Sequence, residues 1–402
     1  MSELSYLEKL MDGVEVEWKT LEDITLRTSN IKWREAIRSY RYIDLTSVDI
    51  ATKKIIETTE ITKNNAPSRA QKLVDENDVI FATTRPTQQR FCLIDSEYAG
   101  AVASTGYCIL RAKKDQVLPK WILHWISTSD FKKHVEENQS GSAYPAISDS
   151  KVKECLIPIP CPDNPEKSLA IQSEIVRILD KFTALTAELT AELTAELNMR
   201  KKQYNHYRDQ LLSFEEGSVE WKSLGEVAII TIGAFVRKDK QNPDADYPVY
   251  NGGRTPTGYY EDFNNDGDKI IVSARGANAG FVNKSSTPYW AGNSCYSISV
   301  RSTEQLHWMY VYYYLKQSET KLTGIQQKGG IPAVSKKQME DLLLPIPSKS
   351  EQVRIVTILD KFDTLTNSIT EGLPREIELR QKQYEYYRDL LFSFPKHETT
   401  SN

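Results

Sequence analysis

Hydrophobic residues recur at helical spacing along two long segments of the chain. In the first, which we expect to run from about Ser168 to Phe214, apolar positions step by three and four residues, the spacing of a coiled-coil seam. The second segment, residues 348–394, repeats the pattern, so that ILDKF at Ile178–Phe182 returns at Ile358–Phe362. The seam positions that we single out are Phe182, Leu185, Leu189, Leu193, Leu197, Phe362 and Leu365. The pattern predicts two long helices that pair in antiparallel orientation.

One stretch of the first predicted helix, Thr186–Leu197, reads TAEL three times in succession. Ala, Glu and Leu are strong helix formers, and each four-residue unit lengthens a helix by roughly 6 Å. We therefore interpret this stretch as an adjustable spacer within a helix of about 47 residues, roughly 70 Å long. The corresponding stretch Thr366–Ile377 has the same length, but Gly372 and Pro374 should kink or interrupt its helix.

Two regions of shorter, strand-like runs accompany the predicted helices. VEWKTL (16–21) opens the first region and VEWKSL (219–224) opens the second. Later segments of the first region return in the same order in the second: Asp78–Arg85 as Asp268–Arg275, Tyr107–Ile109 as Tyr296–Ile298, Trp121–Ile126 as Tyr310–Leu315, Ala143–Ser148 as Gly330–Ser335, and Leu156–Pro160 as Leu344–Pro347. The sequence between these segments differs almost completely. We infer two modules of one fold with different surfaces.

The duplication also predicts a circular arrangement. Leu10–Gly13 precedes the first VEWK segment and resembles Phe214–Gly217, which precedes the second. The chain thus begins where its C-terminal helix would continue, as in a pseudo-twofold molecule. We predict an α+β fold in which two similar α/β domains are separated by two long antiparallel coiled-coil helices. The expected boundaries are an N-terminal segment 1–24, a first domain 25–160, a central helix 161–216, a second domain 217–347, a C-terminal helix 348–394 and a disordered tail 395–402.

Composition limits the class of protein. The chain has 402 residues, of which 26% are charged and 40% hydrophobic, and no apolar run is long enough to span a membrane. Its five cysteines are an odd number without a CxxC pair, so we expect reduced thiols in the cytosol.

The net charge of −4 is distributed unevenly. Residues 25–160 carry 20 Lys/Arg and 16 Asp/Glu, a net charge of +4, and residues 228–347 carry 13 and 11, a net charge of +2. The remainder carries 18 and 28, a net charge of −10. Two mildly basic modules on an acidic frame permit DNA binding without establishing it.

The motifs of several enzyme classes are missing. An amino-methyltransferase needs an Asn/Asp-Pro-Pro-aromatic turn, whereas the nearest segment, Asn242–Ala245, lacks the second proline and the aromatic residue. The sequence has no GxxxxGK[ST] loop for ATP phosphates, and its five histidines are not spaced as zinc ligands. Asp163, Glu166 and Lys167 fit a solvated loop better than a nuclease site. We expect no catalytic residue, no metal and no cofactor on this chain.

The helical segments carry a specific resemblance. The sequences IQSEIVRILDKF (171–182), RKKQYNHYRDQLLSF (200–214) and IPIPCPDNPEKS (157–168), with the TAEL repeats, resemble the shared regions of the specificity subunits of Type I restriction–modification enzymes, and those of the Type IC branch most closely. The resemblance extends over roughly residues 1–24, 156–227 and 342–402, and includes the two modules only in their arrangement.

This resemblance implies a non-catalytic DNA-recognition subunit. Each module would be a target-recognition domain that reads one half of a bipartite, asymmetric site in double-stranded DNA, and the helices would set the spacer between the halves. The helices would also bind two adenine methyltransferase subunits that carry S-adenosylmethionine. Restriction subunits would join for ATP- and Mg-dependent translocation and cleavage. The implied location is the bacterial cytosol, in association with the nucleoid.

Base readout needs Arg or Lys for guanine and Asn or Gln for adenine, on exposed elements. In the first module we select two polar segments, one after a strand-like run and one rich in small residues. Their candidate DNA contacts are Arg85, Gln88, Gln89, Arg90, Ser142 and Tyr144. In the second module the candidates come from a glycine turn and from the segments at matching positions. They are Asn251, Arg254, Arg275, Asn278, Gln326, Gln327 and Lys328. Solvated loops are the alternative for every one of them.

Two aromatic sets have competing interpretations. Trp121, Trp125, Tyr310 and Tyr314 recur at helical spacing and fit a core better than a base-stacking surface. The pairs Tyr204/Tyr207 and Tyr384/Tyr387 fit either the helix seam or a partner-binding surface. For the whole chain, the alternative to DNA recognition is a coiled-coil scaffold with two protein-binding modules. A self-sufficient methyltransferase is disfavoured because the catalytic turn is missing.

Overall fold

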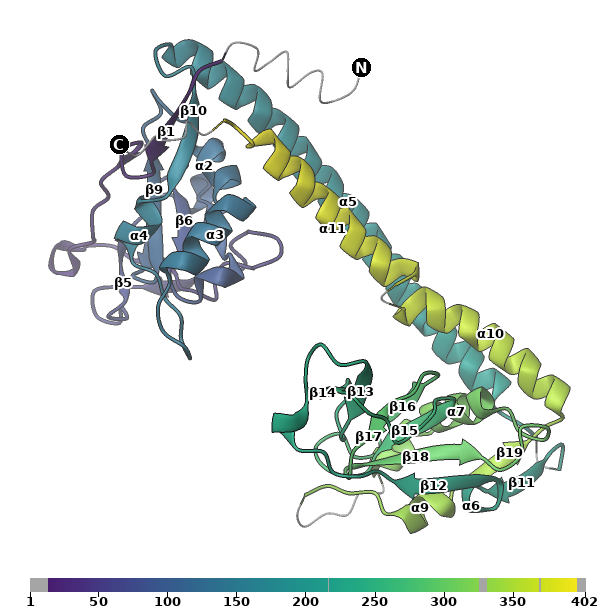
Figure 1. The fold of residues 1–402 in the computed structure, drawn as a ribbon. Helices are drawn as coiled ribbons and strands as arrows, with labels where there is room; N and C mark the ends of the chain where they lie inside the picture. The colour runs from purple at the N-terminus through teal and green to yellow at the C-terminus, as the bar shows by residue number, and fades with distance from the viewer. Residues whose placement is uncertain (1–13, 216, 325–330, 369, 396–402) are drawn as a thin grey trace. The chain divides into compact units, whose positions relative to one another are not determined.

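The computed structural model describes residues 14–215, 217–324, 331–368 and 370–395. These residues form two compact units, each containing one mixed module of helices and sheets (Figure 1). The first unit comprises Met1–Ala191 and Glu378–Asn402, and the second comprises Glu192–Ile377. Each unit therefore combines one module with parts of both long helices. The predicted α+β fold class is confirmed.

A four-stranded antiparallel sheet forms the centre of each module. The order in the first is β2-β9-β6-β7, with β2 at Thr25–Leu26, β6 at Val79–Ala82, β7 at Phe91–Leu93 and β9 at Tyr107–Ala112. The order in the second is β12-β18-β15-β16, with β12 at Ala228–Ile232, β15 at Lys269–Ser273, β16 at Val282–Ser285 and β18 at Cys295–Val300. The same topology from dissimilar sequences confirms the predicted duplication.

A second sheet accompanies the central one in each module, with four strands in the first module and three in the second. In the first, β3 (Tyr40–Ile43) pairs antiparallel with β4 (Thr59–Ile61) and parallel with β8 (Val102–Ser104), which also pairs with β5 (Ala70–Leu73). In the second, β13 (Tyr247–Tyr250) pairs antiparallel with β14 (Gly258–Tyr260) and parallel with β17 (Trp290–Ala291). The 3₁₀ helices are η1 (Trp33–Glu35), η2 (Pro86–Gln88), η3 (Ser96–Tyr98) and η4 (Lys238–Lys240).

The strand pairing shifts the residue-by-residue correspondence between the two modules by one position from the match made by sequence. Val79 pairs with Leu110 in the first sheet and Ile270 pairs with Ile298 in the second, and these side chains belong to the two main cores. Tyr296 therefore corresponds to Cys108, and not to Tyr107 as the shared tyrosine suggested. Since a one-residue shift moves every strand side chain to the other face of a sheet, burial fixes this register and a single matching letter does not.

Short helices form the rest of each module and contribute the aromatic core. They are α2 (Pro119–Trp125), α3 (Ser129–Asn138) and α4 (Asp149–Lys153) in the first module, and α6 (Leu224–Val227), α7 (Trp308–Gln317), α8 (Glu319–Gly324) and α9 (Lys336–Glu340) in the second. Trp121, Trp125, Tyr310 and Tyr314 are buried, which confirms their core assignment. Trp121 Nε1 donates to the Pro158 carbonyl at 3.0 Å, and Tyr310 Oη donates to that of Pro345 at 2.9 Å.

These carbonyls belong to two-stranded ribbons made by the repeated segments. β1 (Val16–Thr20) pairs with β10 (Leu156–Pro160), and β11 (Glu220–Ser223) pairs with β19 (Leu343–Ile346). Trp18 lies opposite Pro158 and Trp221 lies opposite Pro345. Trp18 Nε1 also donates to the carbonyl of Pro395, near the end of the described chain. The N-terminal ribbon and the C-terminal segment thus belong to one unit, as the circular arrangement predicts.

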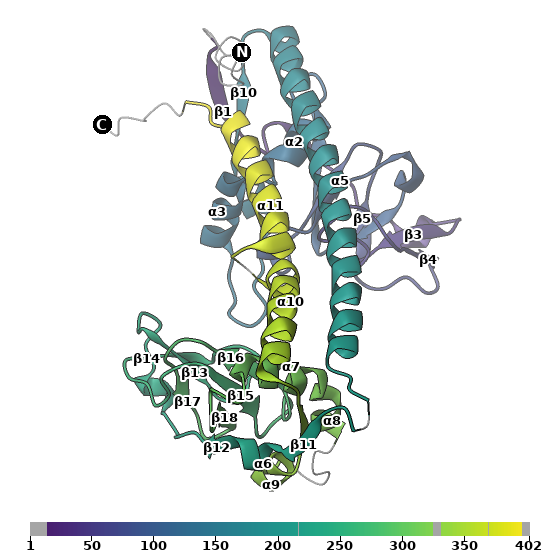
Figure 2. The ribbon, with the colours of Figure 1, turned by 90° about the vertical axis from the view of Figure 1, so that its right-hand side faces the viewer.

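The long helices are α5 (Pro165–Leu211), α10 (Lys349–Asn367) and α11 (Gly372–Leu391) (Figure 2). α5 begins before the expected Ser168 because Asn164 is the residue that caps it, accepting a hydrogen bond from the Lys167 amide at 3.0 Å. The predicted interruption of the second helix is confirmed: Asn367 ends α10, and Gly372 starts α11 with φ of +78°. A Cβ on Gly372 would lie 2.5 Å from the Thr364 carbonyl oxygen, so glycine fits this break.

Buried glutamines join the long helices to the modules in the same way in both units. Gln172 accepts from the Leu118 amide at 2.9 Å and donates to the Gln116 carbonyl at 3.0 Å. Gln352 accepts from the His307 amide at 2.8 Å and donates to the Gln305 carbonyl at 3.1 Å. Each side chain has both ends of its amide satisfied, as burial requires.

The aspartates of the two ILDKF segments make a second pair of joints. Asp180 accepts hydrogen bonds from His124 at 2.9 Å and Lys120 at 2.6 Å, and the bond from His124 is the main cause that lowers the pKa of its carboxyl. Asp360 accepts from Tyr313 Oη at 2.5 Å. The same position therefore connects helix and module through different partners.

Equivalent aromatic pairs connect the helices within each unit. The rings of Phe182 and Tyr387 stack at 5.7 Å with an interplanar angle of 5°, and those of Tyr207 and Phe362 stack at 5.6 Å with an angle of 27°. The TAEL repeats are helical throughout, but Leu185 is 51% exposed and Leu189, Leu193 and Leu197 are only partly buried, as is Leu365. The described contacts between the helices thus include stacked aromatic rings, whereas the seam leucines are only partly buried or exposed.

Candidate DNA-recognition loops

In the first module, the candidate loop Thr83–Arg90 begins where β6 ends. The Arg85 amide donates to the Pro145 carbonyl at 2.7 Å, and the Ile147 amide donates to that of Thr83 at 2.9 Å. Arg85 has a left-handed backbone with φ of +49°. Its exposed guanidinium lies 5.3 Å from the ring centroid of Tyr144, within the range of a cation–π contact. The structure thus brings together two candidates that lie far apart in sequence.

The second module holds its loop by the same pair of hydrogen bonds. The Gly276 amide donates to the Pro332 carbonyl at 2.9 Å, and the Val334 amide donates to that of Ala274 at 2.9 Å. Gly276 is also left-handed, with φ of +92°. The predicted match of the two loops is therefore present, but Arg275 takes the place of Thr84, and Gly276 that of Arg85. Arg275 is exposed and forms a β-bridge with Ala333.

Two of the first module's candidates are engaged by the protein itself. Arg90 Nη1 donates to the Val48 carbonyl at 2.5 Å. The Gln89 carbonyl accepts from Lys53 Nζ, which also lies 4.4 Å from the centroid of the Phe91 ring. Burial lowers the pKa of Lys53 to about 8. Gln88 is exposed, whereas Gln89 and Arg90 are partly buried. The loop thus presents Arg85 and Gln88 to solvent and uses Gln89 and Arg90 to fix its own shape.

In the second module, hydrogen bonds join the glycine turn to the Arg275 loop. Asn251 Oδ1 accepts from the Ser294 amide at 3.3 Å. Asn278 Oδ1 accepts from Arg254 Nε at 3.3 Å, and its Nδ2 donates to the Gly252 carbonyl at 3.4 Å. The Arg254 guanidinium is exposed and lies 5.4 Å from the Phe281 ring centroid. Both asparagines therefore organise the turn, and Arg254 remains available to a ligand.

The remaining candidates fall into two groups. Ser142 and Tyr144 lie on an exposed segment that starts at Gly141, whose φ is +95°. Gln326, Gln327 and Lys328 lie outside the described residues.

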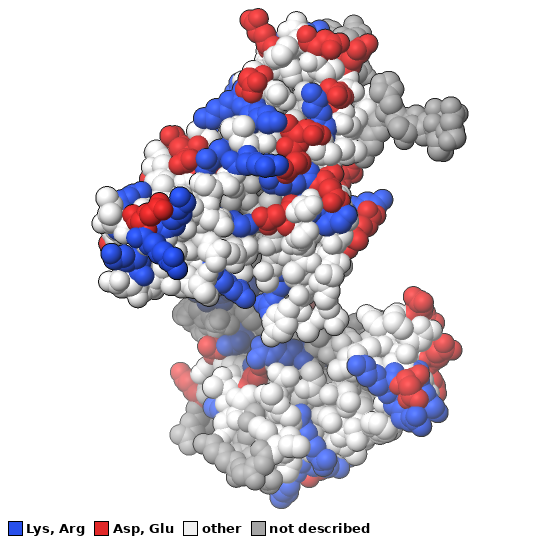
Figure 3. All heavy atoms as spheres, turned by 90° about the vertical axis from the view of Figure 1, so that its left-hand side faces the viewer, with Lys and Arg blue, Asp and Glu red and all other residues white. Residues whose placement is uncertain are grey.

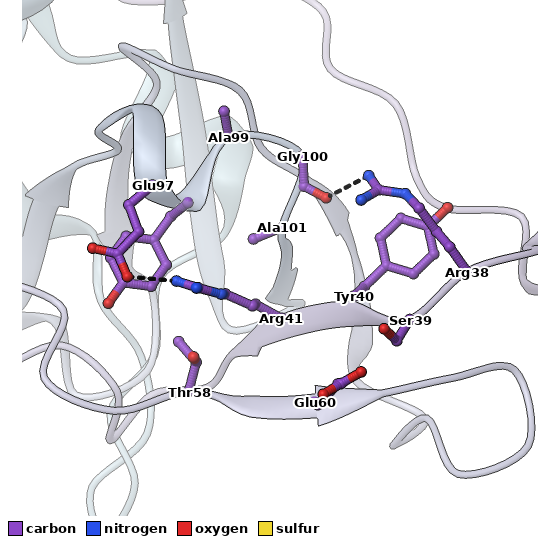
Figure 4. A pocket seen from close by; sticks show the side chains of 11 residues that line it. Arg38, Ser39, Tyr40, Arg41, Thr58, Glu60, Glu97, Ala99, Gly100 and Ala101 are labelled. Carbon is purple, nitrogen blue, oxygen red and sulfur yellow. Dashed lines mark hydrogen bonds and ion pairs between the residues drawn. The ribbon is translucent and has the colours of Figure 1, made fainter.

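A surface hollow near the second sheet of the first module, β4-β3-β8-β5, was not singled out from the sequence. It has a volume of ≈ 550 Å³ and is lined by residues from Arg38–Arg41, η3 and the turn after it (Figure 4). The Arg38 guanidinium lies over the Tyr40 ring at 4.4 Å, and Arg41 pairs with Glu97 at 2.6 Å. That hydrogen bond raises the pKa of Arg41. In the sequence, the segment Arg38–Arg41 is notable for its arginines, but arginines alone do not predict a hollow.

Charge is dispersed over one face of the molecule (Figure 3). On the face shown in Figure 3, Lys and Arg occur in small groups next to Asp and Glu, with uncharged areas between them. Among the described residues, no helix is long and apolar enough to cross a membrane.

Comparison with known proteins identifies the family. The model of the Type I restriction modification DNA specificity domain matches residues 14–199 and again residues 217–379. The chain belongs to this family. It is a specificity subunit of a Type I restriction–modification system, so its part in such an enzyme is recognition and not catalysis.

Similar proteins support the assignment over the full length. The chain is 42% identical to the Type I restriction enzyme EcoR124I/EcoR124II specificity subunit of Escherichia coli, with 100% of both chains covered. It is 37% identical to the EcoprrI specificity subunit of Escherichia coli over 92% of this chain and 93% of that one. The fold is similar to a chain in a solved structure of a type I R-M system, with a TM-score of 0.69, 24% identity and coverage of 94% and 97%. It is also similar to the HsdS subunit of Thermoanaerobacter tengcongensis, with a TM-score of 0.53, 23% identity and coverage of 94% and 96%.

Proposed function

We propose that each module of this specificity subunit reads one half of a bipartite, asymmetric site in double-stranded DNA. The observation that carries the proposal is the repeated loop geometry. In both modules, a loop with an exposed arginine follows the same strand of the central sheet and is hydrogen-bonded to the same proline-containing segment. Loops with a fixed backbone and exposed guanidiniums are suited to base edges and phosphates.

Among the candidates, we assign direct DNA contact to Arg85, Gln88, Ser142 and Tyr144 in the first module and to Arg254 and Arg275 in the second. All six are exposed. Arg90, Asn251 and Asn278 have side chains bonded to the protein and support the loops. Gln89 is partly buried and supports its loop through its backbone carbonyl, which accepts from Lys53. Gln326, Gln327 and Lys328 remain candidates from the sequence alone.

We further propose that the helices set the spacer between the half-sites and bind two methyltransferase subunits, to which restriction subunits are added. S-adenosylmethionine, ATP and Mg belong to those partner subunits. Membership of the Type IC branch is supported by the TAEL repeats and by the full-length similarity to the EcoR124I/EcoR124II specificity subunit. Such a complex would act in the bacterial cytosol, at the nucleoid.

The test is to express this chain with its methyltransferase partner and to map methylated adenines across the host genome. We expect one bipartite motif, and sequence-selective binding of the purified complex whose affinity falls steeply with salt, since cation–phosphate contacts release counterions. Binding without sequence preference, or no methylated motif, would favour the protein-binding scaffold instead.

A further inference from the structure

Each module exposes one large apolar side chain on the segment that is hydrogen-bonded to its arginine loop. Tyr144 is 72% exposed and Ile331 is 76% exposed. Each stands directly before a Pro-Ala pair, Pro145-Ala146 in the first module and Pro332-Ala333 in the second. Two modules with dissimilar sequences thus place apolar bulk at the same point.

The backbone beside each of these residues is fixed. The Pro145 and Pro332 carbonyls accept the hydrogen bonds from the Arg85 and Gly276 amides. The following alanines form β-bridges, Ala146 with Thr84 and Ser140, and Ala333 with Arg275. A single exposed apolar side chain is common on protein surfaces, so exposure alone indicates no ligand. What distinguishes Tyr144 and Ile331 is their matched position, each on a backbone that is hydrogen-bonded to the arginine loop of its module.

The neighbouring charge indicates which ligand this is. The Arg85 guanidinium lies over the Tyr144 ring, and Arg275 is bridged to the residue two positions after Ile331. Both arginines are exposed, and within the described part of the chain neither guanidinium has a hydrogen bond or an ion pair. An exposed guanidinium beside the Tyr144 ring in the first module, and an exposed arginine bridged to the Ile331 segment in the second, are complementary to duplex DNA, which offers phosphates beside stacked bases.

Tyr144 and Ile331 cannot share a hydrogen-bonding role, since isoleucine has no polar side-chain atom. What they share is size and exposure. We propose that they act as apolar wedges, each entering the duplex at one base step of the half-site bound by its own module and unstacking that step. This inference rests on the proposed recognition function. It adds a second source of sequence preference, the energy needed to deform the DNA. The complex would prefer sites in which the base step at the wedge unstacks easily.

The experiment uses the complete methyltransferase complex and its mapped site. Duplexes carry 2-aminopurine, whose fluorescence rises on unstacking, at successive positions of each half-site other than the methylated adenine. We expect the wild-type complex to raise fluorescence at one step in each half-site. Tyr144→Ala should abolish the rise in one half-site only, and Ile331→Ala in the other only. The unaffected half-site reports that each variant is folded and assembled.

Two controls separate a wedge from an ordinary contact. Tyr144→Phe should keep the signal, because ring bulk and not the hydroxyl is required. Ile37→Ala removes another exposed apolar residue, 99% exposed and outside the loop, and should leave both signals intact. Tyr144→Ala should weaken binding about tenfold on matched DNA, and much less on DNA with a mismatch at the wedge step, where unstacking costs little.

The inference is overturned if the wild-type complex binds its site without unstacking any step other than the methylated base, or if both alanine variants leave the fluorescence unchanged. Failure of the recognition function itself would look different: the wild-type complex would then show no sequence-selective binding.

Discussion

At the scale of single residues, the environment of a side chain decides its role. Arg85 and Arg90 lie in one short loop and are equivalent by sequence criteria. Arg85 is exposed, whereas Arg90 donates to the carbonyl of Val48, 42 residues away in the chain. The first arginine can therefore meet DNA, and the second maintains the loop that presents it.

This contrast predicts different phenotypes for two alanine variants. Arg85→Ala should lower sequence-specific affinity about tenfold or more, with no change in stability, because it removes an exposed contact. Arg90→Ala should lower the free energy of unfolding by roughly 1–2 kcal/mol, because it removes a hydrogen bond from a charged donor. Anisotropy titrations and urea unfolding measure the two effects. Equal loss of stability in both variants would contradict the assignment.

Lys53 gives a prediction about pH. Burial lowers the pKa of this amine from its ordinary value of 10.5 to about 8 in the folded protein. Between these two values the unfolded chain binds more protons than the folded one, so the contribution of Lys53 to stability rises as pH increases from about 8 toward 10.5. Below pH 8 both states are protonated, and the cost of burying the charge is fully present.

The measurement compares wild type with Lys53→Met at several pH values. The stability of wild type relative to the variant should increase from pH 7 to pH 9.5. Because other titrating groups contribute equally to both proteins, the difference isolates Lys53. A difference that stays constant over this range would show that the amine is not desolvated in the folded state.

At the scale of elements, periodicity located the helices, and Gly372 and Pro374 indicated the interruption of the second, but neither fixed the helix ends. Ser168 was expected at the start of α5 because it is a good N-cap type. In the structure it is buried, and its hydroxyl accepts from Gln172 at 3.1 Å, while Asn164 caps the helix. Several residues near a helix start can serve as the cap, and tertiary packing selects one of them.

The TAEL repeats carry a prediction at this scale. Deleting Thr190–Leu193 removes roughly 6 Å of α5 and slightly more than one helical turn. Since duplex DNA rises about 3.4 Å per base pair, the spacer of the methylated site should shorten by about one to two base pairs, with both half-sites unchanged. Methylome sequencing before and after the deletion checks this result. Glu192→Ala, which keeps the length, is the matched control, and an unchanged spacer in the deletion variant would refute the proposed ruler.

At the scale of the whole molecule, the chain is two units of one design, each with its own module, core and joints to the long helices. Gln172 and Gln352 make the same pair of hydrogen bonds at equivalent positions, as do the two loop anchors. The repeated parts lie where helix and module meet, and the candidate DNA contacts differ between modules. This division predicts that the modules specify sequence independently.

An exchange of modules tests that independence. Replacing residues 25–160 with the corresponding region of a specificity subunit whose mapped motif differs should change one half-site of the methylated motif and leave the other half-site and the spacer as they were. The equivalent exchange of the second module, residues 217–347, should change only the other half-site. Methylome sequencing reads both outcomes. A chimera in which both half-sites change would show that the modules are coupled.

The sequence by itself determined the helices, the duplication, the family and the segments in which DNA contacts were sought, because helical periodicity and repeated motifs are local properties of the chain. It could not decide which loop residues face solvent or which strand residues of the two modules correspond. Nor could it show that Tyr144 and Ile331 occupy matching positions in the fold. Those outcomes depend on partners distant in sequence: Val48 for Arg90, Pro145 for Arg85 and Pro332 for Gly276. Only the folded chain, which buries one face of each strand and satisfies each buried polar group, selects among the alternatives that local sequence allows.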